Sequence, residues 1–173
     1  MRAALKVLFI LVALGAASCG RPDGVPTVVL VVRHAEKASD AEDSPLTEAG
    51  AQRAQALARL AEGAGVSAVY SSQFRRNLDT VKPFAERAGI NVAQAPVNLQ
   101  SPGGYGKALA ADILDKHAGR TVLVVGHANT VGATVEALAG RPAPPGDVQY
   151  GDLFVVVVPR AGAPMSLKAQ YGM

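Results

Sequence analysis

Two short aliphatic runs in the sequence each end in a histidine. Residues 28–35 read VVLVVRHA, and residues 121–128 read TVLVVGHA. Such runs are typical of strands buried on both faces of a parallel sheet, and open α/β folds bind their ligands at the carboxyl ends of such strands. If the two strands are neighbours, His34 and His127 meet at one edge of the sheet, close enough to act on a single group.

A pair of arginines follows a third short strand. Residues 70–80 read YSSQFRRNLDT, a pattern that predicts a segment leaving the same edge and entering a helix. Backbone N–H groups at a helix start and the fork of an arginine both favour phosphate. Imidazoles beside such cations indicate phosphoryl chemistry, with Arg33 as a further anion ligand.

Other uses of these residues fit the sequence less well. Clustered histidines can bind a metal, but the chain has no His-x-His or His-Glu-x-x-His spacing, so we expect no metal. The glycines of residues 96–106 do not form a Walker nucleotide-binding pattern, since Ser101 stands where its first glycine belongs. We therefore expect a loop there and no cofactor.

The elements that must position these residues alternate between strand and helix. The pattern predicts strands at residues 28–32, 67–70, 90–93, 121–125 and 153–158, with 166–169 pairing at the edge. It predicts helices after the N-cap Thr47, over residues 76–88, around Leu109 and Ile113, and from Val131 to Leu138. This order predicts an α/β three-layer sandwich with a mostly parallel central sheet flanked by helices.

Four blocks of the sequence resemble the histidine phosphatase superfamily, the phosphoglycerate mutase-like proteins. Residues 33–36, Arg-His-Ala-Glu, are similar to that family's Arg-His-Gly-Glu signature, with Ala35 in place of the glycine. The segments LTEAG at 46–50, YSS at 70–72 with Arg76 and Thr80, and Gly126-His127 resemble its later blocks in the same order. The resemblance covers roughly residues 28–140.

The resemblance implies a covalent mechanism and a role for each site residue. His34 would attack the phosphorus of a phosphomonoester as a neutral imidazole and form a phosphohistidine that water hydrolyses, without a metal. Arg33, Arg76 and His127 would bind the phosphate oxygens and stabilise charge in the transition state. Arg76 rather than Arg75 takes the family's second arginine position, and Arg75 is expected to face solvent.

The proton donor to the leaving oxygen is not evident. The family has a Glu or Asp in the loop after the third block or directly after the second histidine, where this chain has Gln100 and Ala128. Glu36 and Asp152 are the candidates. If neither serves, good leaving groups are favoured: phosphoramidates, acyl phosphates or aryl phosphates.

The amino terminus resembles a bacterial lipoprotein signal. Arg2 and Lys6 precede an apolar run at residues 7–17, and small residues lead into Cys19, the only cysteine. We predict a signal peptide at 1–18, lipidation of Cys19, a tether at 19–26 and the phosphatase domain at 27–173. A plain cleaved signal and an uncleaved anchor are the alternatives. The expected location is outside the cytoplasm, in the bacterial periplasm or cell envelope, on a membrane.

The charge of the chain gives no case for nucleic acid as a partner. The formal net charge is +3; without Arg2 and Lys6, 15 basic side chains face 14 acidic ones. The expected partner is a small phosphorylated substrate or a phosphoprotein, and the oligomeric state is open. Two functions remain: a phosphatase, or a weakly active domain of the same fold that binds phosphorylated ligands in a regulatory role.

Overall fold

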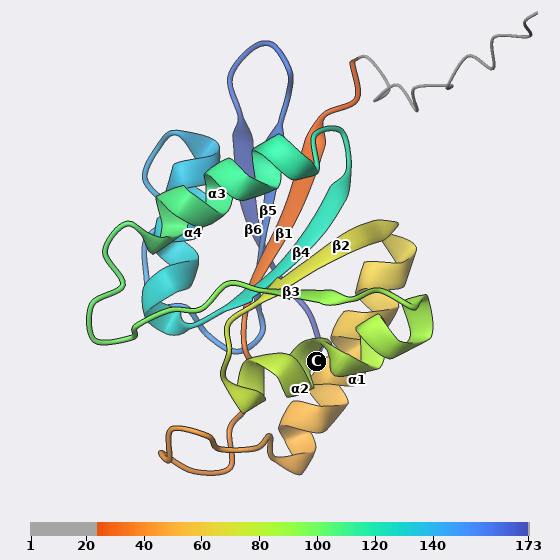
Figure 1. The fold of residues 1–173 in the computed structure, drawn as a ribbon, viewed down its shortest axis with the longest axis vertical. Helices are drawn as coiled ribbons and strands as arrows, with labels where there is room; N and C mark the ends of the chain where they lie inside the picture. Colours follow the sequence, from red (N-terminus) through yellow and green to blue (C-terminus); the bar gives the residue numbers. More distant parts are fainter. Residues whose placement is uncertain (1–23, 173) are drawn as a thin grey trace, which may run out of the picture.

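A single six-stranded sheet forms the centre of the molecule, with the strand order β3-β2-β4-β1-β5-β6 (Figure 1). The structure is a computed structural model that describes residues 24–172. The predicted signal peptide, Cys19 and most of the predicted tether lie outside the described residues. The strands are β1 Thr27–Arg33, β2 Val66–Ser71, β3 Val92–Gln94, β4 Thr121–Gly126, β5 Asp152–Val158 and β6 Met165–Gln170.

The sheet is parallel through its first four strands and antiparallel at one side. β4 pairs in parallel with both β1 and β2, and β2 pairs in parallel with β3. β5 runs antiparallel to β1, and β6 antiparallel to β5 at the edge. The predicted α/β sandwich with a mostly parallel sheet is confirmed. The predicted third strand is shifted by two residues, to Val92–Gln94.

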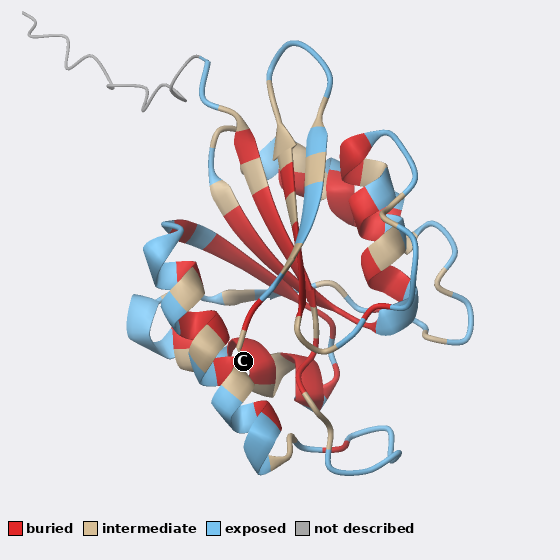
Figure 2. Cartoon of the chain, turned by 180° about the vertical axis from the view of Figure 1, so that it is seen from behind, coloured by how far each residue is buried: buried red, intermediate tan, exposed pale blue. Residues whose placement is uncertain are grey.

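Two helices cover each face of the sheet. The helices are α1 Glu48–Gly63, α2 Arg75–Ala88, α3 Tyr105–Lys116 and α4 Ala128–Ala139. One core cluster joins the sheet to α3 and α4, and a second joins it to α1 and α2. Buried residues follow the middle strands and the inner sides of the helices (Figure 2). None of the helices in residues 24–172 combines the length and apolar character needed to cross a membrane.

The helix ends follow local sequence signals. The Thr47 hydroxyl accepts a hydrogen bond from the Gly50 N–H at 3.0 Å, as expected of the N-cap of α1. α2 and α4 end at Gly89 and Gly140, both with φ of 64°, the left-handed conformation that glycine adopts without strain. These local signals fix where α1 begins and where α2 and α4 end.

We predicted a loop over residues 96–106, and this prediction is wrong at the end of the loop, because α3 already begins at Tyr105. The glycines there read as turn residues, but Gly106 is a buried helical residue. A Cβ at Gly106 would lie 2.5 Å from the Ala133 carbonyl carbon of α4. Gly106 therefore permits the close approach of α3 and α4, and does not mark a turn.

Replacing Gly106 with alanine is expected to lower the free energy of unfolding by about 1–3 kcal/mol, because the added methyl must push two packed helices apart. Chemical denaturation measures this. Gly132→Ala in α4 is the matched control, since a Cβ there meets nothing within 4 Å. It should leave stability unchanged or raise it by up to about 1 kcal/mol. Equal losses in both variants would contradict the packing role of Gly106.

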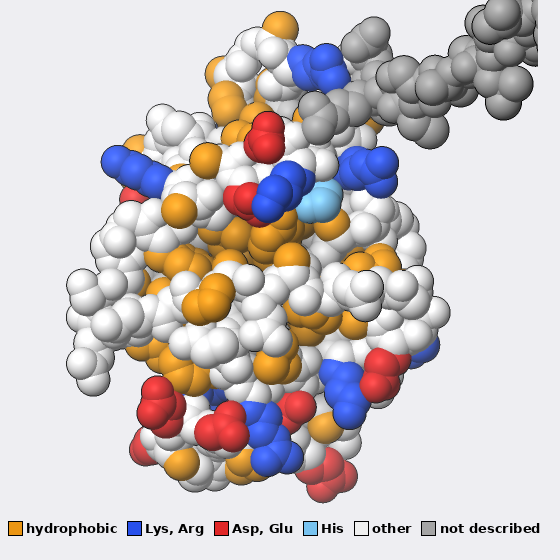
Figure 3. All heavy atoms as spheres, in the orientation of Figure 1, with side chains coloured by type: hydrophobic (Ala, Val, Ile, Leu, Met, Phe, Trp, Pro, Cys, Tyr) orange, Lys and Arg blue, Asp and Glu red, His pale blue; other side chains and the backbone are white. Residues whose placement is uncertain are grey.

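One part of the α3–α4 face stays open. Apolar side chains are visible between α3 and β3, with charged groups above and below them (Figure 3). A hollow of about 340 Å³ lies there, and Tyr70 and Tyr105 are among its lining residues. It is on the other side of the sheet from α1 and α2, and it does not include the two strand-end histidines.

Candidate active site

The two strand-end histidines lie side by side. In the β1–β4 ladder Arg33 is opposite Gly126, and the His34 N–H donates to the Gly126 carbonyl at 2.9 Å. The next residue of each strand is a histidine, and the ring centroids of His34 and His127 are 5.4 Å apart. One phosphoryl group can therefore contact both rings, as the parallel arrangement predicted.

His34 is prepared to act as a nucleophile through one ring nitrogen. Its Nδ1 lies 2.8 Å from the Ala35 carbonyl, so Nδ1 carries the proton and Nε2 keeps its lone pair. The pKa of His34 is lowered to about 4, chiefly by burial; the Ala35 carbonyl acts to raise it, and the charges of Arg76 and Arg33 lower it. At neutral pH His34 is therefore an uncharged imidazole.

His127 is neutral as well and lies between a hydroxyl and a guanidinium. Arg76 Nη2 lies 3.5 Å from His127 Nδ1, and a guanidinium can only donate, so Nδ1 accepts. The proton is then on Nε2, which donates to the Ser72 hydroxyl at 2.9 Å. Burial lowers the pKa of His127 to about 3, with His34 and the two arginines acting in the same direction. A bound phosphate dianion would raise this pKa.

These lowered pKa values make stability depend on pH. An unfolded histidine takes up a proton near pH 6.5, whereas His34 and His127 stay neutral in the fold until about pH 4 and 3. Between those values the unfolded state binds more protons, so stability falls as the pH falls. Urea unfolding from pH 7 to 4.5 should show this decline in the wild type. The double variant His34→Asn/His127→Asn should have a much flatter profile, and an equally steep one would contradict the assignment.

Arg33 and Arg76 bring positive charge to the site. Arg33 Nη1 donates to the Val148 carbonyl at 3.0 Å, and its guanidinium lies 4.0 Å from the centre of the Tyr150 ring. Tyr150 in turn lies 5.8 Å from His34. Arg76 is buried, and its Nη1 donates to the Glu42 carbonyl. In the part of the chain that the structure describes, neither guanidinium forms an ion pair with a carboxylate.

The side chain of Arg75 lies on the surface of α2. It is more than half exposed, and its Nε lies 3.4 Å from the Asp79 carboxylate one helical turn on. The structure thus places Arg76 with the histidines and Arg75 on the surface of α2, which is the arrangement expected from the sequence.

Two buried polar residues of α2 hold the histidine-bearing strand ends. Asn77 Nδ2 donates to the carbonyls of Val125 and Gly126 at 3.1 and 3.0 Å, and the Thr80 hydroxyl accepts the Ala35 N–H at 3.0 Å. Asn77 was not predicted from the sequence. It could have been recognised as a polar residue on the face of α2 that otherwise carries apolar side chains.

Glu36 is bound by an arginine and does not face the phosphate site as a free acid. Arg53 Nε and Nη2 donate to Glu36 Oε1 at 2.9 and 2.7 Å. Burial acts to raise the pKa of Glu36, but the hydrogen bonds and charge of Arg53 lower it below its usual value. Glu36 is therefore a carboxylate at neutral pH. Arg53 also donates to the carbonyls of Tyr171 and Gly172, so the pair ties α1 to the chain end.

Asp152 is also engaged. It is buried at the start of β5, where its Oδ2 lies 2.8 Å from Lys168 Nζ and accepts the Gln149 N–H at 2.8 Å. Both carboxylates that the sequence offered as proton donors are thus held by a cation.

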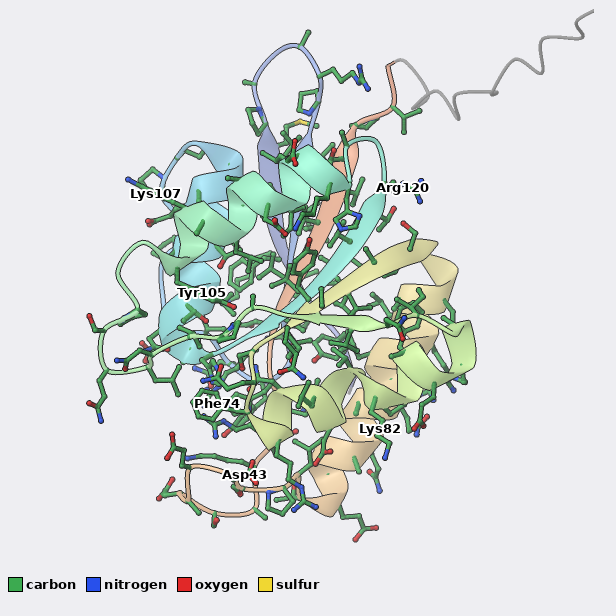
Figure 4. The ribbon with its side chains drawn as sticks, viewed as in Figure 1. Asp43, Phe74, Lys82, Tyr105, Lys107 and Arg120 are labelled. Atoms are coloured by element: carbon green, nitrogen blue, oxygen red, sulfur yellow. The ribbon has the colours of Figure 1, made fainter. Side chains whose placement is uncertain are left out.

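A cleft of about 740 Å³ opens next to Arg76. It is lined by three segments, within residues 37–42, 73–76 and 96–100. Its lining includes Phe74, whose ring lies 5.2 Å from His127, and Phe74 lies above the loop that carries Asp43 (Figure 4). Asp40 and Glu42 are also among the residues that line this cleft. The sequence predicted only a polar loop over residues 38–44, and neither Asp40 nor Glu42 was predicted to lie near the site.

The described residues form no cluster of metal-binding side chains at the site. Over residues 24–172, no group of three or more His, Cys, Asp or Glu side chains is arranged to hold an ion. The chemistry that this geometry supports is transfer of an anionic group to His34 Nε2, with positive charge from Arg33 and Arg76 around the anion.

Comparison with known proteins agrees with this geometry. Residues 29–97 match the family model of the histidine phosphatase superfamily (branch 1). A search of curated proteins gives no significant match. The chain therefore carries the sequence pattern of the histidine phosphatase superfamily over residues 29–97, which include His34, Arg33 and Arg76.

Solved structures share the fold at low sequence identity. The protein histidine phosphatase SixA, solved with tungstate, superposes with a TM-score of 0.66 at 21% identity, over 83% of this chain and 96% of that one. YhfR of Bacillus stearothermophilus gives 0.62 at 21% identity, over 75% and 90%. A phosphoserine phosphatase of Entamoeba histolytica, solved with phosphoserine, gives 0.60 at 17% identity, over 84% and 96%. These likenesses establish a common fold.

Proposed function

We propose that this protein is a phosphatase that hydrolyses a phosphomonoester or a similar phosphorylated substrate through a phosphohistidine on His34. One observation carries the proposal: two neutral histidines lie 5.4 Å apart beside Arg33 and Arg76, and neither arginine forms an ion pair with a carboxylate within residues 24–172. A buried guanidinium such as that of Arg76 is costly without a close anion, and an anionic ligand offsets that cost.

The reaction takes two displacements. His34 Nε2 donates its lone pair to phosphorus while the bond to the leaving oxygen breaks, and the leaving group takes the electron pair of that bond. Water then attacks the phosphohistidine, releasing phosphate and restoring the neutral imidazole. Arg33, Arg76 and His127 bind the phosphoryl oxygens throughout. Each charge-assisted hydrogen bond contributes about 1.5–3 kcal/mol, so three donors can stabilise the transferring group without a metal.

Glu42 is the proton donor that the geometry favours, because Glu36 and Asp152 are bound by Arg53 and Lys168. Glu42 lines the cleft together with Arg76, and its backbone carbonyl fixes the Arg76 guanidinium. General acid catalysis contributes about 10²–10⁴-fold, and most where the leaving group is a poor one.

Glu42→Gln is therefore expected to slow hydrolysis of an alkyl phosphate at least about tenfold and to change that of an aryl phosphate little. Steady-state kinetics on a pair of such esters measures the ratio. Glu86→Gln, an exposed glutamate of α2 paired with Lys82, is the control and should change neither rate. An equal effect of Glu42→Gln on both esters would exclude a proton-donor role and leave good leaving groups as the preferred substrates.

The substrate class follows from the cleft. It has both polar and apolar lining residues and a volume of about 740 Å³, which suits a small phosphorylated molecule or a phosphorylated segment of a protein. If Glu42 does not donate the proton, phosphoramidates such as phosphohistidine, acyl phosphates and aryl phosphates are the favoured substrates. The fold shared with SixA, a protein histidine phosphatase, supports the phosphoramidate choice.

We also propose that the protein acts outside the cytoplasm. The basic residues, apolar run and small residues before Cys19 support export with lipidation of that cysteine. Metabolic labelling with a fatty acid tests it: the wild type should carry label and Cys19→Ser should not. Label in Cys19→Ser, or an unlabelled wild type, would reduce the proposal to export without an anchor.

The second candidate function is a domain that binds phosphorylated ligands with little turnover. The engagement of both Glu36 and Asp152 by cations favours it. A turnover assay with p-nitrophenyl phosphate in the presence of a chelator separates the two, with tungstate binding measured in parallel. Turnover that survives chelation and is inhibited by tungstate supports the phosphatase. Tungstate binding without turnover would support the binding domain instead.

A further inference from the structure

Large apolar side chains are exposed at one end of the sheet. Among the described residues, the exposed large hydrophobics are Val25, Met165 and Leu167, at 42%, 64% and 54% of their surface. The strand register places Val25 and Met165 at the same end, and Leu167 follows on the same edge strand, opposite Val155 at the middle of β5. Thr27, two residues after Val25, is opposite Val158, and Met165 is opposite Val157.

These side chains continue a partly covered apolar strip. Val28 pairs with Val157, which pairs with Met165, and one step along the strands Val155 pairs with Leu167. Cross-strand partners point to the same face of a sheet, here the face that packs on α1. Val28, Val155 and Val157 are only partly buried. We call this surface the apolar corner; it consists of Val25, Val28, Val155, Val157, Met165 and Leu167.

The apolar corner lies where the amino-terminal segment joins the domain. β1 begins at Thr27 at this end, beside the hairpin between β5 and β6 (Figure 1). Thr27 is the eighth residue after Cys19, and eight residue steps join the two. At full extension they span at most about 28 Å. An acyl group on Cys19 would therefore hold this corner close to a bilayer.

The catalytic residues lie at the opposite end of the same strands. β1 runs for seven residues from Thr27 to Arg33, directly before His34. At a rise of about 3.3 Å per residue, the strand separates the two ends by roughly 20 Å. A domain that rests on its apolar corner would direct its cleft away from the surface beneath it.

We propose that the domain docks on a lipid bilayer through the apolar corner, so that the active site faces the aqueous phase. The proposal rests on the predicted anchor at Cys19, not on the catalytic assignment. The acyl chains of a lipoprotein-type anchor hold the protein on the membrane, and the apolar corner adds a contact of the domain itself. Because the anchor keeps the corner near the bilayer, this contact is an intramolecular event.

The charges at this end are compatible with a bilayer. Arg120 directly precedes β4 and is exposed at the same end of the sheet as Val25. Cations at a membrane surface favour anionic headgroups. Lys116, also near this end, is paired with Asp112.

The chain contains no tryptophan, so a single introduced one reports its own surroundings. We would place Leu167→Trp in the full lipidated chain on vesicles of phosphatidylethanolamine and phosphatidylglycerol that carry bromine on their acyl chains. Leu99→Trp, on the cleft at the opposite end, is the matched control. We expect brominated lipid to quench Leu167→Trp several-fold more than Leu99→Trp, with a blue shift of the Leu167→Trp emission only when vesicles are present.

Three outcomes would overturn the proposal. If the protein sediments with vesicles but both tryptophans are quenched equally or not at all, the domain extends freely on its tether. If it does not sediment with vesicles, the anchor itself is absent. If Leu167→Trp is already shielded without lipid and the protein is a dimer by light scattering, a second copy covers the edge strand β6. In each case hydrolysis of p-nitrophenyl phosphate is measured separately, so the proposed phosphatase function stands or fails on its own.

Discussion

Replacing His34 with alanine is expected to reduce the turnover of p-nitrophenyl phosphate to near background, a loss of the order of 10⁶-fold, as is found when a covalent nucleophile is removed. His34 is the only group at the site with a neutral nitrogen free to attack phosphorus. Its Nδ1 is committed to the Ala35 carbonyl, and His127 offers its nitrogens to Ser72 and Arg76. The cations that remain can bind phosphate but cannot accept it covalently.

The third histidine provides the control. His117 follows α3, where its Nε2 lies 3.1 Å from the Tyr70 hydroxyl, and it contacts neither of the other histidines. His117→Ala should keep wild-type turnover. Substantial hydrolysis by His34→Ala would mean that water attacks phosphorus directly, and the covalent mechanism would then be wrong.

Arg76→Ala is expected to lower kcat/KM by about 10²–10³-fold, the usual loss when one donor to a transition-state oxyanion is removed. Its buried guanidinium adjoins His127 and lies over the Phe74 ring at 4.6 Å, so it has a fixed direction. Arg75→Ala, one residue earlier, removes the same charge and nearly the same volume from the surface of α2. It should cost less than about twofold, since exposed ion pairs contribute little.

The comparison of neighbouring arginines tests the register of α2. Equal losses in the two variants would show that long-range charge, not contact, is what the site requires. A larger loss for Arg75→Ala would show that the helix is rotated and that the wrong arginine has been assigned. Thermal unfolding of both variants should be run alongside, because Arg76 also holds the Glu42 carbonyl.

The positions of His34 and His127 could be predicted because they depend on the order of residue types along the chain. A short aliphatic run before each histidine, at residues 28–32 and 122–125, indicated buried parallel strands, and parallel neighbours bring equivalent residues together. The choice of Arg76 over Arg75 came from the family resemblance, and the α2 register agrees with it. The edge pairing of β6 with β5 likewise followed from a short strand after a hairpin.

The partners of the charged groups could not be predicted. Nothing in the sequence indicates that Arg53 reaches Glu36 across 17 residues, or that Lys168 neutralises Asp152, because both contacts depend on how α1 and β6 pack. Glu42 was missed for a related reason: its loop has no periodic pattern, and only the fold brings it beside Arg76. The start of α3 was missed because Gly106 serves helix packing.

The most direct test of a phosphohistidine intermediate on His34 is to trap the phosphoenzyme. The protein, freed of metals by a chelator, would be mixed with a ³²P-labelled phosphorylated substrate and quenched within milliseconds, and the label then assayed for stability to acid and base. We expect a labelled protein in which the phosphorus–nitrogen bond is labile in acid and stable in base. The label should be on His34 and absent from His34→Ala. A bond stable in acid, or label that persists in His34→Ala, would contradict a phosphohistidine on His34.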